Sequence, residues 1–458
     1  SLVVLGSGPS GLATTIGLLG SKKKIVVIDA GLRSKNLIPA AEGPPVLTDL
    51  PSKLRLAHNY AGYKDFQILS PSQQIGFKAI SALVFGGLSN FWGGGLIPYS
   101  PTDLKNFPYS LEDIWSSYEE VFKILTGENI PEELASLIKR NYGSDGTNAE
   151  LTLLDTLLAV NTNSVHSSKT CQLDTCGIGC FSCNFGIFNS AQAMLGLITE
   201  KRIDCFDGYF IRKIEKVKNH YAITCVDLTD GSIKKILAAT IFCSLGTLTT
   251  TRLLLDMLNV EDSIPLLTTP SARFFALSTP LTSADQRTST VAGKTLLFEN
   301  EHQVTANIFP ITANLLESLV GVIASKILLN VFGERFFTRF YIGNMYFPSM
   351  QSSNLAIVKN NELTLIGEIT PSLKLYFRAS LKKLRILLAD FGYRVFPIGN
   401  RLLHPGEDIH YGGTFPMQTR PKSLQCNEQG LLYGEKGFYI CDPSSLPLMT
   451  AKPHTFNS

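Results

Sequence analysis

One of the seven histidines stands in a setting suited to proton transfer. His410 is followed by Tyr411 and a glycine pair, Gly412-Gly413, which would leave open space around its imidazole ring. A neutral imidazole takes up a proton near working pH, so this position suits a general base. A histidine held by hydrogen bonds inside a strand is the structural alternative. The local pattern therefore predicts acid–base chemistry at residue 410.

Four of the nine cysteines form a second group with chemical potential. Cys171, Cys176, Cys180 and Cys183 lie close together, with small residues between them. Thiolates at such spacing bind zinc or an iron–sulfur cluster. Two local disulfides or free reduced thiols are the alternatives. Because the cysteines cluster in a large chain, instead of framing a small secreted domain, we expect a reducing, cytoplasmic compartment.

The beginning of the chain carries a glycine-rich turn between a strand and a helix. An apolar strand, residues 2–5, leads directly into Gly6, Gly8 and Gly11, and a helix follows over residues 12–19. Gly6 permits the turn, Gly8 lets backbone amides approach a pyrophosphate, and Gly11 lets the helix pack closely on the strand. The helix N-terminus adds partial positive charge. This arrangement predicts a phosphate-binding turn of the Rossmann type.

A second strand ends in the acid that such a unit needs. Residues 24–28 form an apolar strand that Asp29 follows. An acidic side chain about 20 residues after the glycines hydrogen-bonds a ribose hydroxyl in dinucleotide-binding units. A turn that merely needs glycine is the alternative, but it leaves Asp29 unexplained. The spacing predicts dinucleotide binding, and the choice between FAD and NAD depends on the rest of the chain.

Five further segments combine turns with buried strands or aromatic side chains. They are residues 85–95 (FGGLSNFWGGG), 206–211 (FDGYFI), 239–255, 410–417 (HYGGTFPM) and 437–447 (GFYICDPSSLP). The glycines of the first segment imply backbone that passes close to something flat or charged. Its aromatic residues indicate that this segment packs against the protein or a ligand. A flexible surface loop is the alternative.

In this order, the segments resemble those of the glucose–methanol–choline (GMC) oxidoreductases. The resemblance implies FAD as the cofactor, a first loop that wraps the pyrophosphate and reaches the flavin, and a small sheet whose first residues flank the adenine. It is specific in roughly a third of the chain, and residues 260–400 carry no matching motif. The flavin-binding residues that it implies are Gly6, Gly8, Gly11, Asp29, Gly86, Gly87, Ser89, Asn90, Trp92, Phe210, Gly246 and Asp442. A helix N-cap is the alternative role of Asp442.

The resemblance also implies the catalytic residues. His410 occupies the position of the family's active-site histidine, which takes a proton from the substrate hydroxyl. In the family, a second His or Asn holds the substrate oxygen. Direct alignment puts Lys452 at the usual Asn, and His454 stands two residues later. We expect His454 to substitute for the Asn, but the identity of the second residue stays open between these two.

The cysteine group resembles a segment of some bacterial GMC-like dehydrogenases. In the flavin glucose dehydrogenase type, such cysteines hold an iron–sulfur cluster. Cys171, Cys176 and Cys180 fit that spacing, while Cys183 is followed by residues similar to those after the cluster's last ligand, so the register is ambiguous. A cluster would lead electrons from the flavin to a protein or quinone acceptor, which favours a dehydrogenase over an oxidase.

Composition excludes several classes of protein. Hydrophobic residues make up 44% and charged residues 17% of the chain, which suits a well-packed enzyme and excludes overall disorder. The net charge of +3 is too small for a nucleic-acid-binding surface.

No signal peptide is visible, and both ends look trimmed. The apolar residues 315–332 fall short of a bilayer span, and we expect a buried helix there, with a helix docking on a membrane as the alternative.

We therefore expect an α/β protein with two domains. Residues 1–259 and 401–458 would form a discontinuous Rossmann-like FAD domain, with a cysteine-rich insert near residues 165–190. Residues 260–400 would form an α+β substrate domain with an antiparallel sheet. The expected reaction is oxidation of the CH–OH group of a small alcohol or sugar-like substrate by hydride transfer to flavin. A degenerate flavin-binding protein and another FAD class, such as an amine oxidase, are the alternatives.

Overall fold

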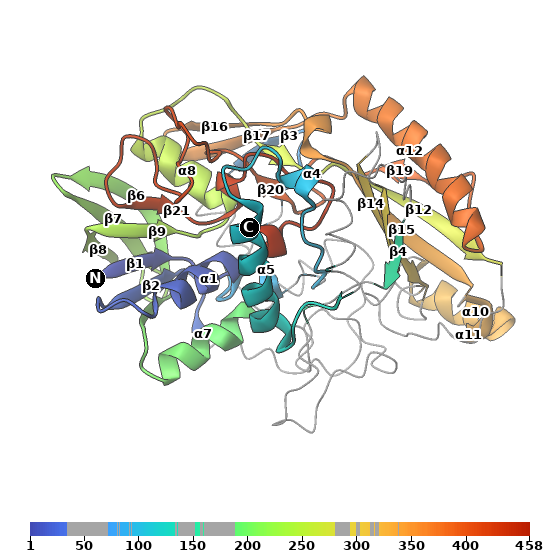
Figure 1. The fold of residues 1–458 in the computed structure, drawn as a ribbon, viewed down its shortest axis with the longest axis horizontal. Coiled ribbons are helices and arrows are strands. Elements are labelled where there is room, and N and C mark those ends of the chain that lie inside the picture. The colour runs from blue at the N-terminus through green and yellow to red at the C-terminus, as the bar shows by residue number, and fades with distance from the viewer. Residues whose placement is uncertain are drawn as a thin grey trace.

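The computed structural model has two lobes that meet along the middle of the molecule (Figure 1). One lobe is built around a parallel sheet and the other around an antiparallel sheet, and the C-terminus lies between them (Figure 1). The structure describes residues 1–33, 72–79, 81, 83–90, 92, 94–132, 135, 152–155, 159, 188–279, 294–298, 303–311, 316, 320–337 and 339–458.

In the five-stranded sheet of the first lobe, all neighbouring strands are parallel. The strands in spatial order are β21 (Phe438–Ile440), β9 (Thr240–Cys243), β1 (Leu2–Leu5), β2 (Ile25–Asp29) and β5 (Asp204–Asp207). β1 and β2 are buried throughout, as the apolar runs of a central parallel strand require. Because the strands come from three distant parts of the chain, the turns at their carboxyl ends meet although the sequence separates them.

Helices and a second sheet cover the two faces of this parallel sheet. Helices α1 (Pro9–Leu18) and α7 (Ser190–Thr199) pack with Val4 and Val27 on one face. Helix α8 (Thr247–Met257) packs with Val3 and Leu5 on the other. The antiparallel strands β6 (Tyr209–Val217), β7 (His220–Asp227) and β8 (Ile233–Ala238) share that second face.

The second lobe is a seven-stranded sheet with antiparallel pairing. Its path runs β18 (Tyr393–Val395), β12 (Ser271–Ser278), β15 (Phe340–Tyr346), β14 (Val304–Pro310), β13 (Lys294–Phe298) and β4 (Thr152–Asp155), and β19 (Arg401–Leu402) also pairs with β12. Helix α12 (Pro371–Asp390) packs on the outer face (Figure 1), against alternate residues such as Phe274 and Met345. The opposite face is therefore free to face the first lobe.

Short elements connect the lobes. A four-stranded sheet contains β10 (Ile264–Pro265), β16 (Leu355–Lys359), β17 (Glu362–Ile366) and β3 (Ser72–Ile75), and a two-stranded sheet contains β11 (Leu267–Thr268) and β20 (Tyr411–Gly412). The helices are α4 (Pro101–Leu104) and α5 (Leu111–Thr126), with 3-10 turns η2 (Gly87–Asn90), η3 (Ser349–Gln351), η4 (Pro443–Ser445) and η5 (Thr455–Asn457). Several of the side chains that meet at the junction lie in these elements or directly next to them.

The fold class expected from the sequence is confirmed: the protein is α/β, with a discontinuous Rossmann-like parallel sheet and a second part built on an antiparallel sheet. The antiparallel sheet recruits strands from outside residues 260–400, since β4 and β19 both belong to it. The residue boundaries of the two domains stay a prediction.

The apolar stretch near residue 320 lies at the surface, so the expected buried helix is wrong for its described part. Helix α10 (Val322–Phe332) exposes Ile323, Ile327 and Val331, the first by 78%. These positions repeat every four residues and form one apolar stripe. Among the described residues, no helix is long and apolar enough to cross a membrane.

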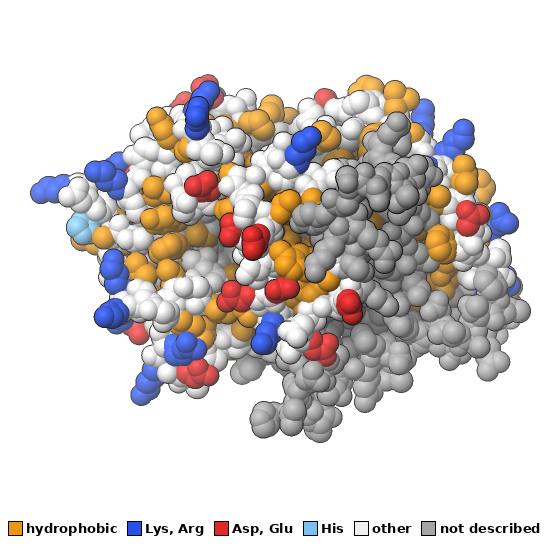
Figure 2. Space-filling view, viewed as in Figure 1, with side chains coloured by type: hydrophobic (Ala, Val, Ile, Leu, Met, Phe, Trp, Pro, Cys, Tyr) orange, Lys and Arg blue, Asp and Glu red, His pale blue; other side chains and the backbone are white. Residues whose placement is uncertain are grey.

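Figure 2 shows how charge is distributed over one face. Lysine and arginine side chains are scattered around its edge, and acidic side chains gather near its middle (Figure 2). The described residues of this face therefore carry no basic patch. This distribution agrees with the small net charge of +3.

Candidate active site

The glycine-rich turn after β1 has the geometry that its sequence requires. Gly6 adopts a φ of +97°, and a Cβ on it would lie 2.4 Å from the carbonyl oxygen of Ser244. A Cβ on Gly11 would lie 2.1 Å from the carbonyl oxygen of Gly6. These two glycines therefore allow the close contact between turn, helix and neighbouring strand.

Unlike Gly6 and Gly11, Gly8 has open space beside its Cα, and this space suits a ligand. A Cβ on Gly8 would come no nearer to the described protein than 4.0 Å, the distance to the carbonyl oxygen of Gly86. Gly8 is also the N-cap of α1, and no side chain caps that helix. Amides of the first helical turn lack intrahelical acceptors, so they are available to a phosphate group.

Asp29 ties this turn to the second glycine-rich loop. Its carboxylate accepts hydrogen bonds from the Ser7 amide (2.7 Å), the Ser7 hydroxyl (2.8 Å) and the Gly31 amide (2.6 Å). The Ser7 hydroxyl in turn accepts from the Gly86 amide at 2.7 Å. Burial raises the pKa of Asp29 to about 6, although the bonds to Ser7 and Gly31 oppose this. A carboxylate has about four acceptor positions, so one remains for a ribose hydroxyl.

The other predicted residues of the second loop hold the loop itself. The Ser89 hydroxyl contacts the Gly86 carbonyl (2.6 Å) and the Ser190 hydroxyl (2.7 Å), which joins the loop to the start of α7. The Asn90 amide donates to the Phe85 and Gly87 carbonyls. Gly87 has a φ of +55°, and a Cβ added to it would lie 3.5 Å from the Gly8 Cα.

Trp92 also packs on protein. Its indole Nε1 donates to the Phe188 carbonyl at 2.9 Å, and its ring joins an apolar cluster with Leu96, Phe122 and Phe456. The two glycine-rich loops are thus brought together, and Trp92 anchors the second one to α5 and the C-terminal segment.

Asp442, Gly246 and Phe210 lie around α8. Asp442 is the N-cap of η4, which is the alternative role that the sequence predicted for it. Its carboxylate accepts hydrogen bonds from the Thr250 hydroxyl at 2.5 Å and the Ser444 amide at 2.9 Å. Burial raises its pKa, while the hydrogen bonds from Ser444, Thr250 and Gly246 oppose the rise. Gly246, with a φ of +80°, precedes α8, and a Cβ there would meet no described atom within 4 Å. Phe210 is buried in β6, and the Arg252 guanidinium lies 5.7 Å from its ring centre.

His410 lies at the junction of the two lobes, directly before β20. Pairing of β20 with β11 places Thr269 beside it, and the Thr269 Oγ1 lies 2.5 Å from the His410 Nδ1. Tyr346, at the end of β15 in the antiparallel sheet, packs on the imidazole with 5.4 Å between ring centres. Ile409 precedes it with a φ of +62°, an unusual conformation for a β-branched residue that the surrounding packing must hold.

His454 is the second histidine at this junction. Its ring meets His410 edge-on, with 4.7 Å between ring centres. The Nδ1 of His454 is buried, and no hydrogen-bond partner lies within the described residues. Burial lowers the pKa of His454 to about 4. Burial also lowers the pKa of His410 well below 6.5, and the repulsion that a protonated His454 would exert adds to this effect. Both rings are therefore neutral at neutral pH.

Lys452 is turned away from this pair. Its Nζ lies 2.5 Å from the Asp103 Oδ2, and both side chains are nearly inaccessible, at 8% and 5% exposure. Asp103 also accepts from the Ser100 amide (2.7 Å) and hydroxyl (2.8 Å). Of the two candidates left open by the sequence, the structure brings His454 against His410 and engages Lys452 with Asp103.

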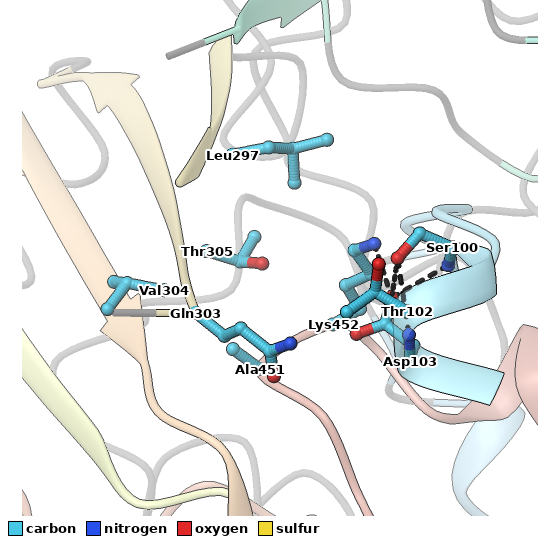
Figure 3. A pocket seen from close by; sticks show the side chains of 9 residues that line it. All are labelled: Ser100, Thr102, Asp103, Leu297, Gln303, Val304, Thr305, Ala451 and Lys452. Carbon is cyan, nitrogen blue, oxygen red and sulfur yellow. Dashed lines mark hydrogen bonds and ion pairs between the residues drawn. The ribbon is translucent and has the colours of Figure 1, made fainter. Parts of the chain in front are cut away.

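A small pocket lined by both polar and apolar side chains adjoins the Lys452–Asp103 pair (Figure 3). Its lining comes from α4, from the β13 and β14 strands, and from the C-terminal segment that carries Lys452 (Figure 3). Thr305 of β14 pairs with Tyr346 of β15, the residue that packs on His410. The pocket and the histidine pair thus adjoin the same face of the antiparallel sheet.

Thr269, Tyr346 and Asp103 were missed from the sequence. Thr269 and Tyr346 stand in no recognisable motif, and each of the three reaches the site through strand pairing or through a contact between distant segments. Asp103 lies in a capping box, Ser100–Asp103, which predicts a helix start but no ion pair.

The predicted metal ligands Cys171, Cys176, Cys180 and Cys183 lie outside the described residues. Within the described part of the chain, no group of three or more His, Cys, Asp or Glu side chains could hold a metal ion. The cysteines that the structure describes, Cys205, Cys225, Cys243, Cys426 and Cys441, are free thiols. Zinc and iron–sulfur binding therefore have no support here.

No protein-family model matches the chain, and no curated protein matches it by sequence. A solved structure similar to it is pyridoxine 4-oxidase from Mesorbium loti, with a TM-score of 0.61. The alignment covers 100% of this chain and 96% of that one, at 13% sequence identity. The similarity extends over both lobes, and at this identity it shows a shared fold.

Proposed function

We propose that the protein is an FAD-dependent oxidoreductase that oxidises the CH–OH group of a small alcohol or sugar-like substrate. The observation that carries the proposal is the pair of neutral histidines, His410 and His454, with 4.7 Å between their ring centres at the junction of the two lobes. The motif resemblance to GMC oxidoreductases and the fold shared with pyridoxine 4-oxidase support it.

The residues of the first lobe fit FAD. The open side of Gly8, the uncapped start of α1 and the remaining acceptor position of Asp29 suit a pyrophosphate and a ribose. Gly246 offers a second open backbone position on the same sheet edge. FAD, when bound, supplies the hydride acceptor.

His410 has the properties of the base that removes the hydroxyl proton. Because its pKa is well below 6.5, the ring is neutral and has a free lone pair at neutral pH. If its Nδ1 carries the proton and donates to the Thr269 Oγ1, the lone pair is on Nε2, the nitrogen left for the substrate. Thr269 is then a positioning residue that selects the tautomer.

His454 is the second polar group that holds the substrate oxygen. Its unpartnered Nδ1 supplies the hydrogen-bonding capacity that the site needs. The ion pair of Lys452 with Asp103 supports this assignment over a degenerate protein, because the histidine that lies against His410 is His454. The proposal also includes two further points. The enzyme is a dehydrogenase that passes electrons to a protein or quinone acceptor, and it contacts a membrane through α10.

The test is anaerobic reduction of protein-bound flavin. Purified protein, loaded with FAD, is mixed without oxygen with a panel of alcohols and sugars, and flavin bleaching is followed by absorbance. We expect bleaching with at least one substrate and a loss of about 100-fold or more in His410→Ala, because a general base contributes 10²–10⁴-fold. The control is His220→Ala, at the exposed first residue of β7.

Two results would end this proposal. One is a chain that binds no FAD at any concentration. The other is a His410→Ala variant that keeps the full rate of flavin reduction while retaining its flavin.

A further inference from the structure

The inner face of the antiparallel sheet carries a row of polar side chains one step from the histidine pair. The row crosses five strands in register: Arg401 (β19), Arg273 (β12), Asn344 (β15), Asn307 (β14) and Thr295 (β13). Residues paired across antiparallel strands point to the same side of the sheet. The row therefore lies on the face opposite α12, which packs against the alternate residues Phe274 and Met345.

This row lies within reach of a substrate held at His410. The preceding row on the same face contains Ser271 and Tyr346, and Tyr346 packs on the His410 ring. Two residues along a strand span about 7 Å, so Arg273 lies about that far from the Ser271 row. This separation suits the two ends of one small molecule.

Arg273 is partly buried, and no described residue forms an ion pair with it. Within the described part of the chain, its guanidinium forms no hydrogen bond and no ion pair, and its Nε is fully buried. Desolvation is the main cause of its lowered pKa, followed by the charge of Arg401, while Tyr346 and Glu407 oppose this change only in part. A desolvated charge without a partner is costly, so native proteins pair such groups or use them to bind.

Among the described residues, the nearest charges are those of Arg401 and Glu407, and neither acid nor base forms an ion pair with Arg273. Arg401 stands directly opposite it on β19, an arrangement in which like charges repel. The nearby acid Glu407 forms an ion pair with the Lys78 Nζ at 2.9 Å. Burial raises the pKa of Asp408 well above its ordinary value, which favours its neutral form. The Ser271 hydroxyl is buried and likewise has no partner among the described residues.

We propose that Arg273, with Arg401 and Asn344 beside it, binds an anionic group of the substrate, so that the substrate class is alcohols that carry a carboxylate or a phosphate. This inference rests on the proposed function for the position of the reacting carbon at His410. The planar guanidinium offers two parallel donors that match either anion.

The experiment measures binding without turnover, using three matched three-carbon alcohols: glycerol, glycerate and glycerol 3-phosphate. Isothermal titration calorimetry on the FAD-loaded protein gives each affinity. We expect glycerate or glycerol 3-phosphate to bind at least tenfold more tightly than glycerol, and the preferred anion distinguishes the two chemistries. Arg273→Gln is expected to reduce that affinity roughly 10-fold to 100-fold, the range for a hydrogen bond to a charged group. Arg273→Lys is expected to lose less.

Arg394→Gln is the matched control, since Arg394 lies on β18 of the same sheet but is exposed. It is expected to keep the preference for the anionic alcohol. The absence of any preference over glycerol in the wild type, or an equal loss in both variants, would overturn the proposal.

A second measurement separates binding from a structural role. In anion-free buffer, Arg273→Gln is expected to have a Tm equal to or above that of the wild type, because it removes an unpartnered desolvated charge. A lower Tm would mean that Arg273 supports the fold, which contradicts the proposal. Failure of His410-dependent oxidation would end the proposed function but leave the anion preference intact, so the two failures are distinguishable.

Discussion

The buried ion pair between Lys452 and Asp103 yields the sharpest stability prediction. In Lys452→Met, the Asp103 carboxylate stays buried, and the donors that it keeps among the described residues are the Ser100 amide and hydroxyl. Removing one member of a buried pair costs about 3–5 kcal/mol, because it leaves an uncompensated charge. The two remaining hydrogen bonds place the expected cost at the lower end, about 3 kcal/mol.

The assay is denaturant unfolding, in which a change of midpoint with an unchanged slope reports stability. The double variant Asp103→Asn/Lys452→Met removes the charge as well and should recover most of the loss. An exposed pair, Lys24–Asp204, with side chains 65% and 53% exposed, is the control. Lys24→Met should cost no more than about 1 kcal/mol. The reasoning is refuted if Lys452→Met costs as little as Lys24→Met, or if the double variant is no more stable than the single one.

Three further predictions concern the candidate site and its cradle. Thr269→Val should lower the rate of flavin reduction about tenfold, through loss of the hydrogen bond to His410, with unchanged flavin content and rescue by Thr269→Ser; an unchanged rate would exclude a positioning role. Because burial lowers the pKa of His454 to about 4, its stabilising contribution is complete above pH 6.5 and is lost as pH falls from 6.5 to about 4. Between pH 6.5 and 4, the free energy of unfolding of His454→Asn should fall by about 3 kcal/mol less than that of the wild type. An equal pH dependence of the unfolding free energy in both proteins would contradict this reasoning. Gly11→Ala should destabilise the protein by roughly 1–3 kcal/mol in the same assay, since its Cβ would lie 2.1 Å from a carbonyl oxygen, whereas Gly17→Ala, at an open position of the same helix, should be neutral or stabilising; equal effects would refute the close contact.

Local sequence determined the first part of the fold. The strand, the glycine turn and the helix of residues 2–18 lie in one continuous segment, so the positive φ of Gly6 and the contact of Gly11 with the Gly6 carbonyl could be predicted from spacing. The contact of Gly6 with Ser244 joins distant segments and could not. The same holds for Asp442, whose N-cap geometry follows from the residues directly after it. Asp29 was predicted at the right edge of the sheet, but its bonds to Ser7 and Gly31 became apparent only in three dimensions.

Tertiary structure decided which distant side chains meet. The sequence favoured His454 as the partner of His410 but left Lys452 open, and only contacts between distant segments distinguish them: His454 lies against His410, and Lys452 pairs with Asp103. The row that contains Arg273 exists because antiparallel strands align in one register, and a shift by one residue would turn each of its side chains to the other face. Spacing along the chain determines contacts within a turn or a helix, whereas contacts between lobes depend on packing that no local pattern encodes.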